Sequence, residues 1–258
     1  MEGNMVGIGA KVAAVTGLRY LERDFLCFPL AGREAISRNL GWLKLLAMVA
    51  MLFDHVAILC LRHFPHYGQA ELLRAPGRLS VPVFAFLVAV GYEWFTRDRV
   101  RYALRLWVFA VISEPVYLAF FGQAGNAILP LALGATLLLS LDSLGRKSGV
   151  ALFVLAVVMT EFYFFLDREQ AILLEVVLVF LFHQAIRQGA WARWGGPIVL
   201  VIALLNAVVP VYLGMVFVSL ALILLSVRVD WGLPELRGGK YLGYGFYPGH
   251  LLLLAMIG

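Results

Sequence analysis

The chain has 258 residues, of which 62% are hydrophobic and 14% are charged, and its formal net charge is +5. Soluble domains are about half apolar and about a quarter charged, so this composition excludes a disordered chain, a coiled coil and an ordinary soluble enzyme. Because open sheets and irregular segments leave backbone groups unpaired in lipid, the sequence predicts an all-α, polytopic bundle of transmembrane helices.

Residues 1–40 contain no predicted span, and we expect this segment to lie in the cytoplasm or on the membrane surface. A transmembrane domain is predicted over residues 41–258, where apolar segments approach the ~20 residues that a helix needs to cross a bilayer. These segments predict about nine spans, at approximately 41–62, 79–95, 103–121, 126–141, 149–165, 169–187, 197–210, 212–228 and 241–257.

The distribution of basic residues predicts the orientation of the bundle. Loops on the cytoplasmic side of a membrane carry an excess of Lys and Arg. With a cytoplasmic N-terminus, the alternating loops and helix ends place 17 of the 21 basic residues on the inner side. The net positive charge then reflects topology and contact with membrane lipid, and no nucleic-acid partner is expected.

Two ionisable residues stand side by side in the first predicted span, where each costs roughly 2.5–3.5 kcal/mol to insert. They are Asp54 and His55. Lys44 lies eleven residues before His55, so the helical period places both on one face, about 16 Å apart, while Asp54 points about 100° away. A neutral histidine can take a proton from an attacking amine or hydroxyl, whereas the alternative is that the pair only forms hydrogen bonds between helices.

Arginines mark both ends of the second predicted span. Arg78 stands at its outer start, where it either extends to the membrane interface or binds an anion. At the inner end, Arg97, Arg99, Arg101 and Arg105 form a basic rim. This rim is either a topology signal that contacts anionic lipid or a binding site for a phosphate-rich cytosolic ligand.

The later spans carry polar residues beside prolines. Glu114 lies in the middle of the third predicted span, and Pro115 is expected to interrupt that helix. Asn126 opens the fourth span from the outer side.

The last predicted span contains Pro248 and Gly249 directly before His250. We expect this pair to break the helix. Since irregular backbone at membrane depth is tolerated only inside protein or beside a cavity, Tyr247 and His250 are predicted to line a cavity wall.

Four blocks of the sequence are similar to the TraX family over about residues 40–258. In chain order they read LKLLAMVAMLFDH, GRLSVPVFAFLVAVGYEWFTRDRVRYALRLWVFAVISEPVY, NAILPLALG and FYPGHLLLL. The resemblance implies an acetyltransferase of the bacterial inner membrane that uses acetyl-CoA and acetylates the N-terminus of pilin. The chain also resembles the wider membrane acyltransferases, whose early span carries Arg-x10-His. Lys44 and His55 have the same interval, with lysine in place of arginine.

The resemblance implies that His55 is the catalytic base and that Asp54 is its motif neighbour. Three further residues complete the expected catalytic site: Arg78, Tyr247 and His250. The residues expected to bind the donor are Lys44, Arg97, Arg99, Arg101, Arg105, Glu114, Asn126 and Lys240. The expected partners are acetyl-CoA, membrane lipid and a pilin-like peptide or another surface acceptor, and no metal is expected.

The chain departs from the family pattern at three places. Gly249 stands where the last motif usually has leucine, Pro130 stands where the fourth-span motif has threonine, and Asp167–Glu169 replaces an Asp-Tyr-Gly sequence. These changes leave the histidines intact but alter positions that could shape the acceptor pocket. The acceptor is therefore open, and pilin is one candidate.

Two other classes of function use the same polar residues differently. A transporter for a small anion would use them as a relay, and inverted repeats would favour it, but the sequence contains no evident repeat. A non-catalytic pilus assembly factor would not account for the Asp54–His55 pair or for the basic rim. The sequence therefore favours an acetyltransferase.

Overall fold

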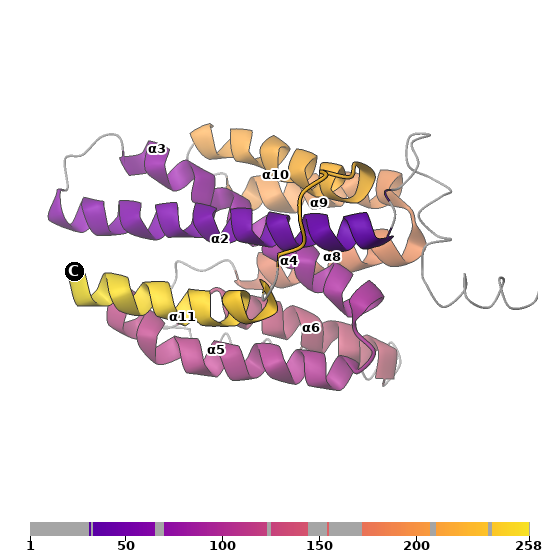
Figure 1. Ribbon diagram of the computed structural model, residues 1–258, viewed down its shortest axis with the longest axis horizontal. Coiled ribbons are helices and arrows are strands. Elements are labelled where there is room, and N and C mark those ends of the chain that lie inside the picture. The colour runs from indigo at the N-terminus through magenta and orange to yellow at the C-terminus, as the bar shows by residue number, and fades with distance from the viewer. Residues whose placement is uncertain are drawn as a thin grey trace, which may run out of the picture.

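The computed structural model describes residues 31, 33–64, 70–122, 125–143, 154, 172–206, 210–236 and 239–257. For residues 33, 70, 71, 210, 211, 239–242 and 244 it describes the backbone alone. Within these ranges every regular element is helical, which confirms the predicted all-α class (Figure 1).

Most predicted spans coincide with a helix of the structure. In chain order the elements are α2 (Arg33–His63), α3 (Ala70–Arg74), the 3-10 turn η2 (Ala75–Leu79), α4 (Ser80–Val90), the π-helical turn η3 (Gly91–Phe95), α5 (Arg99–Phe121), α6 (Ile128–Ser143), α8 (Ile172–Gln188), α9 (Trp191–Leu205), α10 (Pro210–Arg228) and α11 (Gly239–Ile257). Apart from residue 154, the predicted span 149–165 lies outside the described residues. The first helix begins at Arg33, before the predicted start at 41, because Ala35, Ile36 and Leu40 already bury apolar side chains.

The helices identify a multi-pass membrane protein. Three stretches of the described chain are long and apolar enough to cross a bilayer, at Glu34–His63, Leu72–Phe95 and Arg99–Phe121, and several shorter apolar helices accompany them. Large apolar side chains cover the outside of the bundle; Phe217 is 71% exposed and Met256 is 77% exposed. Exposed apolar surface of this kind fits a lipid environment.

Helix α4 forms the centre of the bundle. Its sequence, SVPVFAFLVAV, is apolar on all sides, as expected for a helix that is surrounded by others. It packs against α2, α6 and α8, and the ring of Phe86 meets Phe182 of α8 edge-on at 5.5 Å. Nearby, Gly134 lets α6 approach α8 closely, since a Cβ at that position would lie 2.9 Å from Val179.

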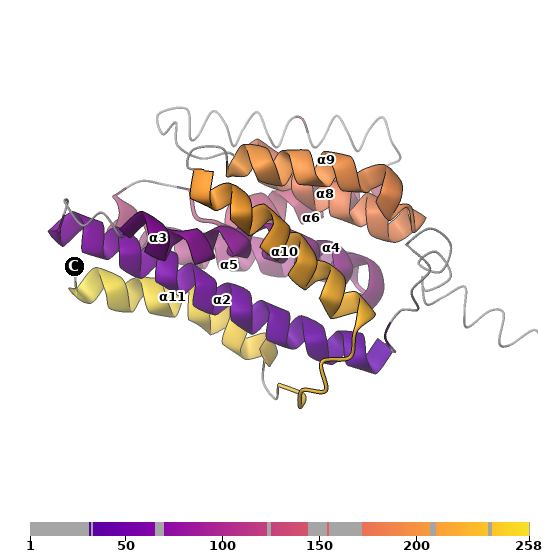
Figure 2. The same ribbon diagram turned by 90° about the horizontal axis from the view of Figure 1, so that it is seen from above.

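Helix α11 lies alongside both α2 and α5, although it closes the chain (Figures 1 and 2). The end of α10 and the segment after it are held against the first turns of α2. The side-chain amide of Asn39 donates hydrogen bonds to the carbonyls of Ser226 and Val229, at 2.9 and 2.6 Å, and its oxygen accepts from the backbone N–H of Trp231. This anchoring allows residues of α11 to face residues of α2 along the bundle.

The two prolines predicted to break helices do not break them. Helix α5 continues through Pro115 and α11 through Pro248. A proline removes one backbone donor, but packed neighbours and side chains in a membrane bundle can hold the remaining helix together. One such side chain is that of Asn126, whose amide donates to the carbonyl of Ala110 in the turn before Pro115.

Candidate active site

Two histidines meet where α2 packs against α11. Nδ1 of His55 lies 2.7 Å from Nε2 of His250, and the ring planes are nearly parallel, with centroids 5.0 Å apart. Both side chains are buried, and Phe120 and Phe121 of α5 pack against the ring of His55. The structure therefore joins two predicted site residues that are 195 positions apart in the sequence.

The hydrogen bonds of this pair determine which ring nitrogen can accept a proton. Nδ1 of His250 lies 2.7 Å from the carbonyl oxygen of Phe246, which can only accept, so this nitrogen carries the hydrogen and donates. Nε2 of a neutral His250 then accepts from Nδ1 of His55. In the neutral pair the remaining lone pair is on Nε2 of His55, where a general base needs it.

His55 lies on the wall of a cavity of about 500 Å³ that is lined from several helices. The wall carries two carboxyl groups, those of Asp54 and Glu175, and two guanidinium groups, those of Arg74 and Arg78. Concave sites of this size, with a few polar groups set among apolar ones, are typical of small-ligand sites. His250 is not among the lining residues, so it supports His55 from behind.

Asp54 pairs with an arginine of α3 and not with His55. Its Oδ1 accepts a hydrogen bond from Nε of Arg74 at 3.1 Å, in an ion pair at the cavity wall. Gly77 makes the crossing of η2 over α2 possible, because a Cβ there would lie 2.3 Å from that of Asp54. The structure therefore places Asp54 at the site as the partner of Arg74.

Tyr247 of α11 also lines the cavity and is held against the start of α6. Its hydroxyl oxygen accepts a hydrogen bond from the backbone N–H of Ala127 at 3.1 Å, which leaves its own hydrogen to donate. An N–H at a helix start carries partial positive charge, and accepting from it makes the hydroxyl a better donor. Tyr247 is thus suited to stabilise an oxygen that becomes negative.

Glu114 and Asn126 build the loop on which Tyr247 rests. The Glu114 carboxylate accepts from the backbone N–H of Gly125 at 2.6 Å and from the backbone and side chain of Asn126. The Asn126 oxygen in turn accepts from the N–H of Ile128 at 3.0 Å and caps α6. Both residues were expected at the donor site, and that role stays a prediction. In the structure they position the cavity wall, and about 20 Å of helix separate Glu114 from Arg101.

Arg78 faces the cavity from η2, as its predicted anion-binding role requires. Its guanidinium lies 4.5 Å from the ring centroid of Tyr212 in α10. Its Nε is buried and has no hydrogen-bond partner among the described residues.

Sequence reasoning left two cavity residues out of the site. Glu175 lies in the first turn of α8 and Asn206 directly after α9, and both line the cavity. A carboxylate inside a predicted span was a signal for Glu175. Asn206 gave none, because an asparagine after an apolar run is the usual way for a helix to end.

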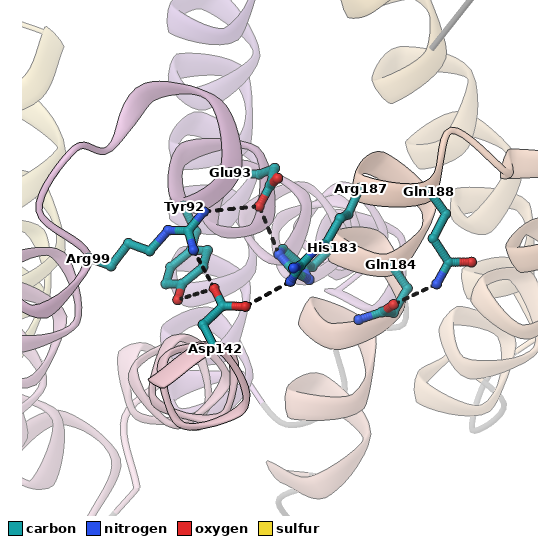
Figure 3. Close-up of polar contacts among 8 residues, drawn as sticks. All are labelled: Tyr92, Glu93, Arg99, Asp142, His183, Gln184, Arg187 and Gln188. Carbon is teal, nitrogen blue, oxygen red and sulfur yellow. Dashed lines mark hydrogen bonds and ion pairs between the residues drawn. The ribbon is translucent and has the colours of Figure 1, made fainter. Parts of the chain in front are cut away.

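The predicted basic rim is divided between two roles. Arg99 turns into a network of ion pairs, with Nη1 at 2.5 Å from Asp142 and Nη2 at 3.5 Å from Glu93 (Figure 3). His183 and Arg187 of α8 bind the same two carboxylates, at 3.1 and 2.7 Å. This network joins η3, α5, α6 and α8, so Arg99 has a structural role, and its role in donor binding stays a prediction.

The other three rim arginines remain near the surface. Arg97 is exposed, and the Arg101 side chain is 80% exposed while paired with Asp98 at 2.9 Å. Arg105 donates from Nε to the carbonyl of Arg101 at 3.1 Å. These three stay candidates for contact with an anionic ligand.

Lys44 lies on the same side of α2 as His55, as predicted. Its Nζ packs so closely on α11 that a Cβ at Gly243 would lie 2.0 Å from it. Both Lys44 and His55 therefore face α11. The side chain of Lys240 lies outside the described residues, and within the described part of the chain no group of three or more His, Cys, Asp or Glu is gathered for a metal.

Comparison with known proteins gives one family match and one relative. A family model described as TraX protein matches residues 39–258. A probable fimbrial assembly protein, FimC of serogroup H1 from Dichelobacter nodosus, is 35% identical over 115 residues. That match covers 38% of this chain and 46% of the relative, so it spans less than half of the relative's length. No solved structure matches the chain.

Proposed function

The chain belongs to the TraX protein family, and from this membership we propose that it is an acetyltransferase that carries an acetyl group across the bacterial inner membrane. The donor is cytosolic acetyl-CoA, and the acceptor is an amine or hydroxyl on the outer side. The observation that carries the proposal is the free Nε2 of His55 on the wall of a 500 Å³ cavity. The N-terminus of a pilin is one candidate acceptor, in keeping with the fimbrial assembly named for the relative.

The transfer needs a base and an oxyanion donor. The acceptor nitrogen or oxygen attacks the acetyl carbonyl, its proton passes to Nε2 of His55, and Tyr247 donates a hydrogen bond to the developing oxyanion. The carbon–sulfur bond then breaks, and His55 passes the proton that it took from the acceptor to the thiolate of CoA. Protonated His55 still donates from Nδ1 to His250, which holds the ring in place while Nε2 gains and then loses a proton.

The donor side of the proposal uses the basic end of the bundle. With the N-terminus in the cytoplasm, the phosphates of CoA bind near Arg97, Arg101 and Arg105, and the acetyl thioester reaches His55 at the cavity. Lys44 lies about 16 Å from His55 along α2, towards the cytoplasmic end of that helix.

Acetyl-CoA binding tests the proposal directly. A ligand that binds only the folded state raises the melting temperature, by an amount that grows with its concentration. We expect acetyl-CoA and CoA to stabilise the purified protein in detergent more than ATP does. Absence of any shift at millimolar acetyl-CoA would contradict the enzyme proposal and favour a small-anion transporter or a non-catalytic assembly factor.

Charge reversal of Arg101 and Arg105 tests where the donor phosphates bind. We expect the double change to Glu to raise the KM for acetyl-CoA, and to raise it more at low salt, because exposed charges are screened by ions. The matched control is charge reversal of Arg62, an exposed arginine in the last turn of α2, at the end of that helix away from the predicted cytoplasmic side. An unchanged KM at low salt would place the phosphate site elsewhere.

A further inference from the structure

The cavity wall holds a guanidinium group and a carboxyl group, those of Arg78 and Glu175, that do not pair with each other. Arg78 makes no ion pair with any described residue, and its contact is the ring of Tyr212. Glu175 likewise makes no hydrogen bond or ion pair with the described residues, although it lines the same cavity. By contrast, Asp54 and Arg74 neutralise each other at 3.1 Å. The wall therefore carries one guanidinium group and one carboxyl group that have no ion-pair partner among the described residues.

Asn206 supplies a further unused acceptor. It is only 3% exposed, and its amide group donates to the carbonyl of Ile202 at 2.8 Å. Its Oδ1 is buried and has no hydrogen-bond partner among the described residues, and the residue lines the cavity. A buried polar atom normally has a partner, so a lone carbonyl oxygen inside a cavity points to a ligand group that donates.

From these groups we infer that the cavity binds a zwitterionic acceptor, with its ammonium group at Glu175 and Asn206 and its anionic group at Arg78. The inference rests on the proposed function for the cavity being the acceptor site. Glu175 and Asn206 can only accept from the ligand with their free oxygens, whereas a guanidinium can only donate. A ligand that carries only an ammonium or only an anionic group would engage one end of this wall and leave the groups at the other end without a partner.

The charge pattern defines the ligand more narrowly than an amine or a hydroxyl. The anionic group can be a carboxylate or a phosphate, since a guanidinium binds either in the same bidentate manner. The acceptor end is therefore amino-acid-like or of the phosphoethanolamine type. Both share a short separation between the ammonium and the anion, which suits a cavity of this volume.

A matched set of small probes tests the inference on the full-length protein. β-Alanine carries both charges, propylamine only the ammonium and propionate only the carboxylate, on chains of the same length. We expect β-alanine to stabilise the protein against heat at a concentration at least tenfold lower than either of the other two. A comparison with 2-aminoethyl phosphate then shows whether the carboxylate or the phosphate is preferred. Equal stabilisation by the three matched probes, or none by any of them, would overturn the inference without use of a variant.

Two charge-removing variants assign the ends. Glu175→Gln keeps the shape of the side chain. We expect it to weaken the binding of β-alanine and of propylamine at least tenfold and to leave the binding of propionate unchanged. Arg78→Gln should instead weaken the binding of β-alanine and of propionate. Glu235→Gln and Arg193→Gln, at exposed positions outside the cavity, are the controls. The proposed arrangement would be contradicted if Glu175→Gln weakened propionate binding and Arg78→Gln weakened propylamine binding. It would also be contradicted if both variants weakened the binding of all three probes equally.

The failure of this inference can be separated from failure of the proposed function. If acetyl-CoA binds but β-alanine shows no preference over the single-charge probes, the enzyme proposal survives and the zwitterion site does not. If β-alanine is preferred but acetyl-CoA does not bind, the cavity recognises zwitterions in a protein that is no acetyltransferase.

Discussion

Replacement of His55 by glutamine is expected to lower acetyl transfer by about 10²- to 10⁴-fold, the usual contribution of a general base. Glutamine has no nitrogen lone pair to take the acceptor's proton, and nothing else in the pair can replace Nε2 of His55. The kcat measured with saturating acetyl-CoA should fall, while the thermal shift by acetyl-CoA should persist. Turnover at the wild-type rate in this variant would rule out the proposed mechanism.

A histidine on the same helix provides the matched control. His63 is exposed in the last turn of α2, and His63→Gln should leave kcat unchanged. His250→Gln separates support from catalysis, because glutamine offers an oxygen that can still accept from Nδ1 of His55. We expect a smaller fall in kcat in His250→Gln than in His55→Gln. If the two losses were equal, His250 would take part in the chemistry itself.

The spans could be predicted from sequence because lipid imposes one requirement on long apolar segments, which must satisfy their backbone groups as helices. The ends were less predictable. Helix α2 starts at Arg33 because its first turns bury side chains against other helices, and such packing has no local signal. Local rules also failed at Pro115 and Pro248, where neighbouring helices keep each helix continuous.

The candidate site could be predicted residue by residue but not as an arrangement. An ionisable group in a span is costly, and this alone singled out His55 and Glu114. Their partners depend on tertiary structure: His55 meets a histidine of α11, and Glu114 accepts hydrogen bonds from the loop before α6. Arg99 shows the same limit, since nothing in the sequence indicated its ion pairs with Glu93 and Asp142.

Tyr247→Phe is expected to lower kcat by about 10²- to 10³-fold, as loss of one oxyanion donor does in other acyl-transfer enzymes. The KM for acetyl-CoA should change little, because the hydrogen bond to the substrate oxygen strengthens only as charge develops in the transition state. The change also leaves the N–H of Ala127 without its partner, which costs about 1–3 kcal/mol of stability in a buried position. Thermal unfolding of the variant measures that loss separately from catalysis.

The control for this variant removes another tyrosine hydroxyl that makes a backbone hydrogen bond. Tyr102 donates to the carbonyl of Val88 at 3.3 Å, at the opposite end of α5 from the cavity. Tyr102→Phe should therefore cost some stability and leave kcat as it is. If Tyr247→Phe lowered only the melting temperature, and kcat stayed within twofold of wild type, the role of Tyr247 would be a structural hydrogen bond between α11 and the start of α6. Arg78 would then be the remaining donor on the cavity wall able to stabilise the oxyanion, and it could not be reserved for the acceptor's anionic group.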